Sequence, residues 1–266
     1  MQQSLTPPRS IFITGAAAGI GKAVAQRFAS AGWFVGLSDV DEAALLELAQ
    51  ALGPSRCHVA RLDVSSAQDW NAPLEAFWQA AGQRLDVLFN NAGIAITDAF
   101  EDVPAARHHR VIDINIKGVL NGCHAALPWL KQTHGARVIN MCSASALYGQ
   151  PMLATYSATK AAVRSLTESL DIEWQRHGIR VVDVLPLFVN TAMVANEVSK
   201  MKTVQALGVR LSADDVAGTV WRLAQGVPSR LPVHSTVGWQ TRLFYQLGKW
   251  SPDALNRIVT ARMAGY

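Results

Sequence analysis

Three side chains that could move a proton lie in one short stretch, SASALYGQPMLATYSATKAA, which covers residues 143–162. Tyr156 and Lys160 are four residues apart, so on a helix they share one face. A free phenol has a pKa of about 10, too high for a base at neutral pH, but a neighbouring ammonium favours the phenolate. The spacing therefore predicts that Tyr156 is a general acid/base whose pKa is lowered by Lys160. The alternative is an ordinary helix whose lysine extends to solvent.

A serine precedes the tyrosine by thirteen residues. Ser143 follows an apolar run that predicts a strand, and its hydroxyl could hydrogen-bond a substrate oxygen and polarise it. Ser145 is the alternative, and the interval of thirteen residues favours Ser143.

A glycine-rich turn, ITGAAAGIGKA, follows the first apolar run. Gly15, Gly19 and Gly21 permit close backbone approach, and free amides at the start of the next helix would face a pyrophosphate. The phosphate loop of nucleotide triphosphatases is excluded, because Ala16 and Ala23 stand where it needs Gly and Ser or Thr. A methyl-donor-binding domain could share this turn, but it has no use for the tyrosine and lysine.

Asp39 ends the second apolar run, eighteen residues after Gly21. Its carboxylate could accept hydrogen bonds from both ribose hydroxyls of an adenosine and would repel a 2′-phosphate. No Arg or Lys stands in the loop before Gly19 or directly after Asp39, where Asp41 and Glu42 follow. The sequence therefore favours NAD over NADP; a capping role for Asp39 on the next helix is compatible with this.

Short apolar runs alternate with helical patterns along nearly the whole chain. Runs that predict strands are 10–14, 34–38, 58–64, 86–90, 137–142, 180–185 and a weaker 231–236, and helices are predicted near 20–31, 41–52, 67–82, 104–132, 156–177 and 213–225. Strands that are apolar on both sides and separated by helices form a parallel sheet covered on both faces. We expect a single doubly wound α/β domain, residues 1–236, of about seven strands, with a helical extension of the same domain at 237–266.

The composition is that of a folded globular chain of 266 residues, with 50% hydrophobic and 17% charged residues. No apolar run approaches the ~20 residues that span a bilayer, and the N-terminus MQQSLTPPRS has no export-signal pattern. Cys57, Cys123 and Cys142 show neither metal nor disulfide spacing, and His108, His109 and His124 have no ligand partners at metal spacing. We expect buried free thiols, no metal and a cytoplasmic location.

Charge is unevenly distributed along the chain. Residues 1–199 carry 15 Lys and Arg against 17 Asp and Glu, whereas residues 200–266 carry 9 against 3. Nucleic acid would need clustered cations, and those of the second segment are spread singly among apolar residues. We therefore expect no nucleic-acid partner and read the segment as helices with a solvated basic face.

The extension at 237–266 is rich in tryptophan. Trp239, Leu243, Leu247 and Trp250 share one helical face, and SPD at 251–253 predicts a Ser cap followed by Pro at the first position of a second amphipathic helix. Such a face must cover this subunit, a twin subunit or a lipid surface. We expect a pocket wall or a subunit contact and no membrane contact.

Residues 10 to about 236 resemble the short-chain dehydrogenase/reductase family. The resemblance lies in T-G-x-x-x-G-x-G at Thr14–Gly21, DV at 63–64, NNAG at 90–93, Asn115, Ser143 and Y-x-x-x-K at Tyr156–Lys160. It implies a Rossmann-like domain, a nicotinamide cofactor, hydride exchange between an alcohol and a carbonyl, and homodimers or homotetramers formed through the helices at 104–132 and 156–177.

The resemblance also implies roles for single residues. Tyr156 is the acid/base, and the positive charge of the nicotinamide adds to the effect of Lys160 in lowering its pKa. Lys160 also binds the nicotinamide ribose, Ser143 positions the substrate, and Asn115 distorts its helix to hold a water that relays protons to the lysine. The implied cofactor contacts are Thr14, Gly15, Gly19, Ile20, Gly21, Asp39, Asp63, Val64, Asn90, Ala92, Gly93, Tyr156, Lys160, Pro186, Val189 and Thr191.

The sequence departs from the family in one place: Leu187 follows Pro186 where the family has glycine. We expect its side chain to project towards the substrate or to stiffen the loop. A segment at about 191–213 is expected to cover the substrate. The predicted substrate contacts are Ser143, Ala144, Leu147, Tyr148, Leu187 and Met193, with Val194 and Val198 nearby, and they form a mainly apolar pocket.

The reaction predicted from these residues is hydride exchange between NAD(H) and an apolar secondary alcohol or ketone, aliphatic, cyclic or steroid-like. The alternatives are an NADP-preferring carbonyl reductase and a non-catalytic dinucleotide-sensing protein. A non-catalytic sensor is expected to lack one or more of the catalytic serine, tyrosine and lysine, whereas this chain has all three, Ser143, Tyr156 and Lys160.

Overall fold

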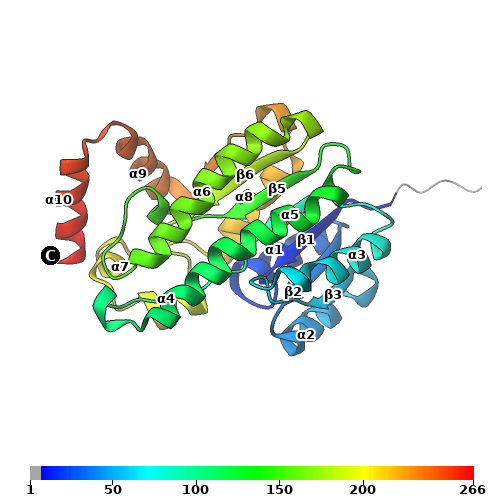
Figure 1. Cartoon of the computed structure of the whole chain (residues 1–266), viewed down its shortest axis with the longest axis horizontal. Coiled ribbons are helices and arrows are strands. Elements are labelled where there is room, and N and C mark those ends of the chain that lie inside the picture. The colour runs from blue at the N-terminus through cyan, green and yellow to red at the C-terminus, as the bar shows by residue number, and fades with distance from the viewer. Residues whose placement is uncertain (1–6) are drawn as a thin grey trace, which may run out of the picture.

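Seven parallel strands form one sheet in the order β3-β2-β1-β4-β5-β6-β7 (Figure 1). The computed structural model describes residues 7–266; residues 1–6, where we expect no export signal, lie outside the described part. The strands are β1 (Ser10–Thr14), β2 (Phe34–Asp39), β3 (Cys57–Arg61), β4 (Val87–Asn90), β5 (Arg137–Met141), β6 (Arg180–Leu185) and β7 (His234–Thr236). The predicted seven-stranded doubly wound α/β fold is confirmed.

Helices cover both faces of the sheet. The α-helices of the described chain are α1 (Gly19–Ser30), α2 (Glu42–Leu52), α3 (Asn71–Ala80), α4 (Ala105–Ile112), α5 (Gly118–Leu130), α6 (Ala154–Trp174), α7 (Lys202–Leu207), α8 (Ala213–Gln225), α9 (Gly238–Trp250) and α10 (Asp253–Ala264). Helices α1, α2 and α8 contribute to one core cluster, and α3, α5 and α6 to another. This division follows from right-handed crossovers that run in opposite directions from β1.

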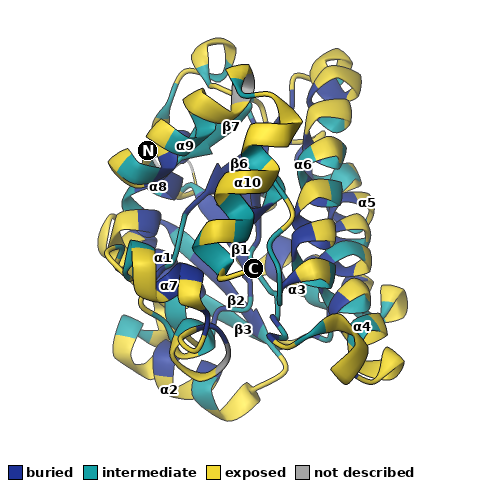
Figure 2. Cartoon of the chain, turned by 90° about the vertical axis from the view of Figure 1, so that its left-hand side faces the viewer, coloured by how far each residue is buried: buried dark blue, intermediate teal, exposed yellow. Residues whose placement is uncertain are grey.

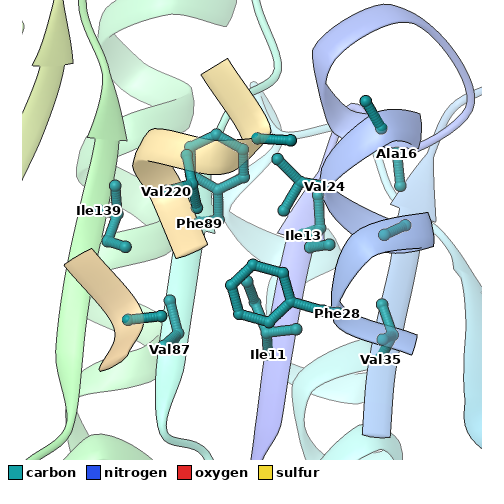
Figure 3. Packing of buried hydrophobic residues seen from close by; sticks show 14 of the residues in the cluster. Ile11, Ile13, Ala16, Val24, Phe28, Val35, Val87, Phe89, Ile139 and Val220 are labelled. Carbon is teal, nitrogen blue, oxygen red and sulfur yellow. The ribbon is translucent and has the colours of Figure 1, made fainter. Parts of the chain in front are cut away.

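Alternate residues of the central strands enter opposite cores. Ile11 and Ile13 of β1 pack against Phe28 of α1 and Val220 of α8, as Figure 3 shows, whereas Phe12 between them joins the cluster on the other face. All five side chains are fully buried. A strand that is apolar on both sides is the expected result of covering a parallel sheet twice.

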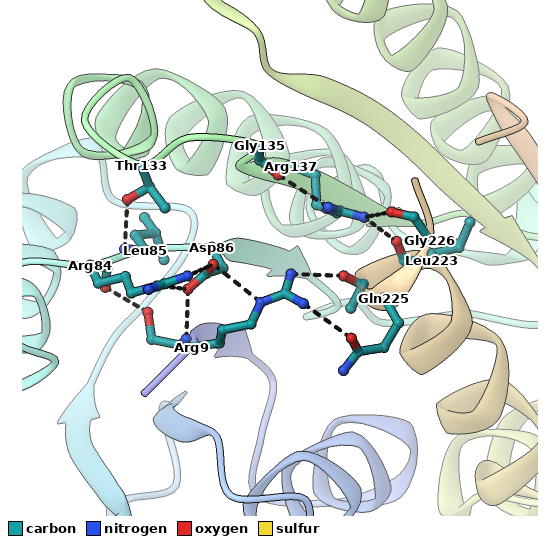
Figure 4. Close-up of polar contacts among 12 residues, drawn as sticks. Arg9, Arg84, Leu85, Asp86, Thr133, Gly135, Arg137, Leu223, Gln225 and Gly226 are labelled. Atoms are coloured by element: carbon teal, nitrogen blue, oxygen red, sulfur yellow. Dashed lines mark hydrogen bonds and ion pairs between the residues drawn. The ribbon is translucent and has the colours of Figure 1, made fainter. Parts of the chain in front are cut away.

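A charged cluster fixes the amino ends of the strands, opposite the edge where the motifs lie (Figure 4). Asp86 is 3% exposed and accepts from Arg84 Nε at 2.7 Å, Arg9 Nε at 3.3 Å and Ser10 N at 2.9 Å. Buried Arg137 donates to the carbonyl oxygens of neighbouring turns, and burial lowers its pKa to about 10. Buried charges need such partners, because an unpaired one would be strongly destabilising.

Several element boundaries differ from the predictions. The helix predicted at 104–132 is interrupted by a π-helix at Asp113–Lys117, and the one at 67–82 begins as a 3₁₀ turn, Ala67–Trp70. The predicted Ser251 cap is wrong. Ser251 N donates to Leu247 O at the end of α9, and Pro252 instead precedes α10, which begins at Asp253.

Helices α9 and α10 form a hairpin at one end of the molecule, where α10 packs beside α7 (Figures 1 and 2). No helix among residues 7–266 is long and apolar enough to cross a membrane. Within the same residues, no group of His, Cys, Asp and Glu could hold a metal ion. Cys123 and Cys142 are buried free thiols, whereas Cys57 is only half-buried.

A half-buried histidine joins β7 to the body of the protein. His234 contacts Asp183 Oδ2 through Nδ1 at 2.9 Å and Glu168 Oε1 through Nε2 at 2.8 Å. Burial lowers the pKa of His234, but the hydrogen bond and charge of Asp183, together with Glu168, outweigh burial and the nearby Arg164 cation. The net pKa of His234 is therefore raised above 6.5.

We predict that His234 makes the stability of the fold depend on pH. A group whose pKa is raised by folding contributes stability that is complete below its unfolded pKa, about 6.5, and is lost as the pH rises through the raised value. Melting curves of wild type and His234→Gln from about pH 5.5 to about pH 9 should differ most at the acidic end. A difference that stays constant with pH would show that the bridge carries no positive charge.

Candidate active site

Tyr156 and Lys160 lie one turn apart on α6, beside the carboxyl end of β5. The Lys160 ammonium is 5.5 Å from the centroid of the Tyr156 ring and donates to Met141 O at 2.8 Å. Lys160 is only 4% exposed, so it is not the solvent-directed lysine of the alternative interpretation. Ser143 directly follows β5 in extended conformation, and its hydroxyl hydrogen-bonds the Tyr156 phenol.

In the protein without a cofactor, the pKa of the Tyr156 phenol is raised rather than lowered. Burial raises the pKa of Tyr156 to about 12, and the opposing hydrogen bond with Ser143 does not compensate. Burial also lowers the pKa of Lys160. In the protein without a cofactor, the ammonium is directed at Met141 O and loss of water around the phenol dominates its pKa. The lowering that we expect from Lys160 together with the nicotinamide charge stays a prediction.

Ser145 holds the hydroxyl of Ser143. The side chain of Ser145 donates to Ser143 Oγ at 3.0 Å, and the backbone N of Ser145 does so at 3.2 Å. A hydroxyl oxygen has two lone pairs, so Ser143 retains its proton for donation into the site. Ser145 is thus a supporting residue rather than a substitute for Ser143.

Asn115 lies at the centre of the π-helix between α4 and α5 and is fully buried. Its amide accepts from Ile94 N and donates to Ile94 O, both at 2.9 Å, and donates to Thr159 Oγ1 at 3.2 Å. The distorted helix implied by the family resemblance is present. An insertion of this kind re-aims a side chain that a regular helix would direct elsewhere.

The glycine turn leaves β1 and enters α1 between two neighbouring loops. Gly15 has φ +67° and Gly19 φ +52°, which favour glycine. A Cβ on Gly21 would lie 2.0 Å from Gly15 O and 2.8 Å from Asn91 Nδ2. No side chain caps the N-terminus of α1, and Ile20 packs its side chain against the core. The turn therefore presents backbone amides that an anionic group could use.

Thr14 and Asn91 fix this turn against the loop after β4. Thr14 Oγ1 accepts from Asn91 N at 3.0 Å and Ala92 N at 3.1 Å, and Asn91 Nδ2 donates to Thr14 O at 2.9 Å. Sequence reasoning assigned no role to Asn91, although it belongs to the NNAG motif. Gly93 lies beside the Asn115 amide and the Lys160 ammonium, since a Cβ there would be 3.2 Å from Asn115 Oδ1 and 3.7 Å from Lys160 Nζ.

Asp39 closes the other side of the turn. Its carboxylate accepts from Ala17 N at 3.1 Å and from Val40 N at 2.7 Å. Asp41, and not Asp39, caps α2, since its Oδ1 accepts from Ala44 N. Arg61 on β3 is the register partner of Asp39 on β2, so a basic residue that sequence spacing did not reveal stands on the neighbouring strand.

Three other predicted cofactor residues have side chains engaged within the protein. Asp63 accepts from Ser65 and Arg110, and Val64 is buried against Gly118. Asn90 donates to Asn140 Oδ1 at 3.0 Å in the core.

The loop after β6 returns to the glycine turn. Pro186 O accepts from Ala144 N at 2.9 Å, and Val189 pairs with Leu211. A Cβ on Gly19 would lie 3.4 Å from Thr191 Cγ2, so Thr191 borders the turn directly.

A cavity of about 510 Å³ opens beside the serine and tyrosine. Its wall includes all six predicted substrate contacts: Ser143, Ala144, Leu147, Tyr148, Leu187 and Met193. The segment at 191–213 contributes Val194, Val198, Thr203 and Leu207 as well. None of the described residues that line the cavity is Asp, Glu, Lys, Arg or His. The site can therefore hold an apolar molecule with an oxygen near the two hydroxyl groups.

Sequence reasoning missed much of the outer wall. Phe188 lines the cavity, as do Phe244, Leu247 and Trp250 of α9 and Leu255, Val259 and Met263 of α10. The tryptophan-rich helical face was the sequence signal for this wall: of its members, Leu247 and Trp250 line the cavity as expected of a pocket wall, whereas Trp239 and Leu243 do not.

Comparison with known proteins agrees with this geometry. The family model described as short chain dehydrogenase matches residues 9–202. Sulfoacetaldehyde reductase 2 of Chromohalobacter salexigens is 34% identical over 254 residues, which cover 93% of this chain and 98% of that protein.

Two solved structures have the same fold. The 3-ketoacyl-(acyl-carrier-protein) reductase from Brucella melitensis complexed with NADH superposes with a TM-score of 0.78 at 29% identity, covering 86% of this chain and 95% of that one. The closed form of serine dehydrogenase complexed with NADP⁺ gives a TM-score of 0.79 at 25% identity and covers 86% and 94%. The chain belongs to the short-chain dehydrogenase/reductase family, oxidoreductases that use a nicotinamide cofactor.

Proposed function

We propose that the protein exchanges a hydride between NAD(H) and an apolar secondary alcohol or ketone. The observation that carries this proposal is the cavity that Ser143 and Tyr156 line together, in a wall whose described residues carry no charge. A non-catalytic dinucleotide sensor has no need for a phenol, a hydroxyl and a buried ammonium at one point.

The residues around the glycine turn fit a dinucleotide. Gly21 makes room that a Cβ would fill, and the uncapped start of α1 supplies amides for a pyrophosphate. Asp39 would accept from the adenosine ribose, and Thr191 and Lys160 would hold the nicotinamide end. We propose Ile20, Asp63, Val64, Asn90, Ala92, Gly93, Pro186 and Val189 as further backbone or supporting contacts. When bound, the nicotinamide supplies or accepts the hydride.

The proton moves through this chain's own side chains. In reduction, Tyr156 gives its phenolic proton to the substrate oxygen while Ser143 donates a hydrogen bond to it. The phenolate that remains lies above the buried ammonium of Lys160, which stabilises the negative charge. Asn115 keeps the loop at Ile94 and the neighbouring Thr159 in place around the lysine.

The wall of the cavity selects against charged substrates. A sulfonate, as in the substrate named for the Chromohalobacter relative, needs a cation to replace its water, and none is among the described lining residues. Leu187 and Phe188 add apolar area next to the reacting groups. We therefore favour aliphatic, cyclic or steroid-like substrates.

Two further points remain part of the proposal. Exposed Leu120 on α5 and Ile172 on α6 support a homodimer or homotetramer formed through these helices. We also propose a cytoplasmic location, supported by the free thiols of Cys123 and Cys142.

We predict that Tyr156→Phe removes activity but not cofactor binding. The loss of a general acid/base lowers kcat by roughly 10²- to 10⁴-fold. Reduced-nicotinamide absorbance with a panel of alcohols measures turnover, and calorimetry measures NAD affinity. A variant that keeps wild-type turnover would contradict the role of the phenol, and turnover of sugars or hydroxy acids alone would contradict the apolar substrate class.

We predict that Asp39→Asn shifts the cofactor preference towards NADP. The change keeps an acceptor for Ala17 N but removes the charge that repels a 2′-phosphate. The ratio of kcat/KM for NADP to that for NAD should rise by at least about tenfold, which corresponds to ~1.4 kcal/mol. Asp41→Asn is the matched control. Wild-type preference for NADP would instead favour the alternative carbonyl reductase.

We predict that Gly21→Ala abolishes dinucleotide binding, because its Cβ would meet Gly15 O at 2.0 Å and displace the turn. Gly218→Ala on α8 is the control, since nothing lies closer than 4.0 Å to that Cβ. Calorimetric titration with NAD measures affinity, and melting curves show whether each variant is folded. A folded Gly21→Ala protein with wild-type affinity would be incompatible with the proposed cofactor site.

A further inference from the structure

The last thirty residues concentrate the exposed apolar surface of the protein. Half of the large hydrophobic side chains exposed among residues 7–266 lie there: Trp239, Leu243, Leu247, Trp250, Leu255, Ile258, Val259 and Tyr266. Trp250 is 88% exposed and Trp239 66%. Figure 2 looks onto this end and shows α10 in front, with exposed ribbon along its outer side. Exposed apolar surface on this scale marks a contact surface.

The same surface is positively charged. Arg242, Arg257 and Arg262 are exposed on α9 and α10, and Asp253 is the one acidic residue between 237 and 266. We call the exposed side chains of α9 and α10 the hairpin face. Tryptophan and leucine on one side of a helix, flanked by arginine, are the features that hold an amphipathic helix in the interface of an anionic bilayer.

The cavity opens at this face. Leu247, Trp250 and Leu255 line the cavity and are themselves 57%, 88% and 51% exposed, so one apolar surface runs from solvent to Tyr156. A ligand dissolved in lipid could enter the cavity along this surface without crossing water.

A second copy of the chain fits the hairpin face less well. In an isologous dimer the same patch meets itself, so the three arginines of one copy would approach those of the other. Bringing like charges together in a contact costs energy, whereas an anionic lipid surface gains from the same charges. Composition alone favoured a pocket wall or a subunit contact. The exposed tryptophans and the exposed arginines of α9 and α10 point to lipid for the part that does not line the cavity.

We propose that the hairpin face docks the protein on an anionic lipid bilayer, with the mouth of the cavity turned towards it. This extends the proposed function by naming lipid as the source of its apolar substrate. Docking on the bilayer does not require the proposed reaction. We therefore expect the inactive Tyr156→Phe protein to bind vesicles like the wild type.

Co-sedimentation with vesicles tests the proposal. The full chain is mixed with vesicles of phosphatidylglycerol and phosphatidylcholine, or of phosphatidylcholine alone, at low and high salt. We expect binding to the anionic vesicles that is at least about tenfold stronger than to the neutral ones and that weakens with salt.

Two paired variants locate the contact. The double variant Trp239→Ser/Leu243→Ser should abolish vesicle binding, because it removes exposed apolar side chains of the hairpin face, and neither residue lines the cavity. Leu46→Ser on α2, where the side chain is similarly exposed, should leave vesicle binding unchanged. Arg257→Gln with Arg262→Gln should weaken binding by roughly 10- to 30-fold at about 1 kcal/mol for each cation. Arg107→Gln with Lys131→Gln is the control for charge.

Three outcomes would overturn the proposal. They are equal binding to both kinds of vesicle, wild-type binding by the Trp239→Ser/Leu243→Ser variant, and dissociation of an oligomer by that variant in light scattering without lipid. The last would assign the hairpin face to a second copy of the chain. Unchanged turnover of a water-soluble alcohol by the same variant would show that its site is intact.

Discussion

A positive charge buried beneath a phenol is the constraint around which the site is organised. Taking the Lys160 ammonium out of water is unfavourable, as its lowered pKa shows, so the protein must supply oxygen atoms to it. The carbonyl of Met141 does so at the end of β5. The lysine therefore ties α6 to the sheet and sets the position of the Tyr156 ring one turn earlier.

The doubly wound topology brings the remaining groups to the same edge. The carboxyl ends of β1, β2, β4, β5 and β6 carry Thr14, Asp39, Asn90, Ser143 and Pro186 within one row. At the opposite edge, the buried Asp86 carboxylate pairs with Arg84, and the buried Arg137 guanidinium donates to Leu223 O. One end of the sheet therefore stabilises the fold, and the other end carries the candidate site. The crevice between crossovers of opposite direction is where such sheets bind ligands.

The fold and the proposed catalytic set could be read from the sequence because both rest on short-range patterns. Strand and helix periods, glycine spacing and Y-x-x-x-K are local, and they located the seven strands and the Ser143, Tyr156 and Lys160 cluster. The support of Ser143 by Ser145, the pairing of Asp39 with Arg61 and the cavity wall from α9 and α10 depend on how distant segments pack, which no local pattern encodes. The effect of burial on the pKa of Tyr156 could not be foreseen, because spacing reveals a neighbouring cation but not the water that burial removes.

Helices α9 and α10 contribute much of the apolar wall that surrounds the candidate site. The family core presents Tyr156 and the glycine turn, while α9 and α10 supply part of the wall of the apolar cavity. Reaction class and substrate class are thus set by different parts of the chain.

The most direct test of the account is the ionisation of the Tyr156 phenol with and without NAD. The chain has 4 tyrosines, so the ring-carbon signals of ¹³C-labelled tyrosine can be followed by NMR and the Tyr156 signal assigned with the Tyr156→Phe variant. The account predicts a pKa of about 12 in the free protein and a clearly lower value in the NAD complex, where the charge of the oxidised nicotinamide adds to that of Lys160. A phenol whose pKa stays at about 12 in that complex would contradict the proposed acid/base role of Tyr156.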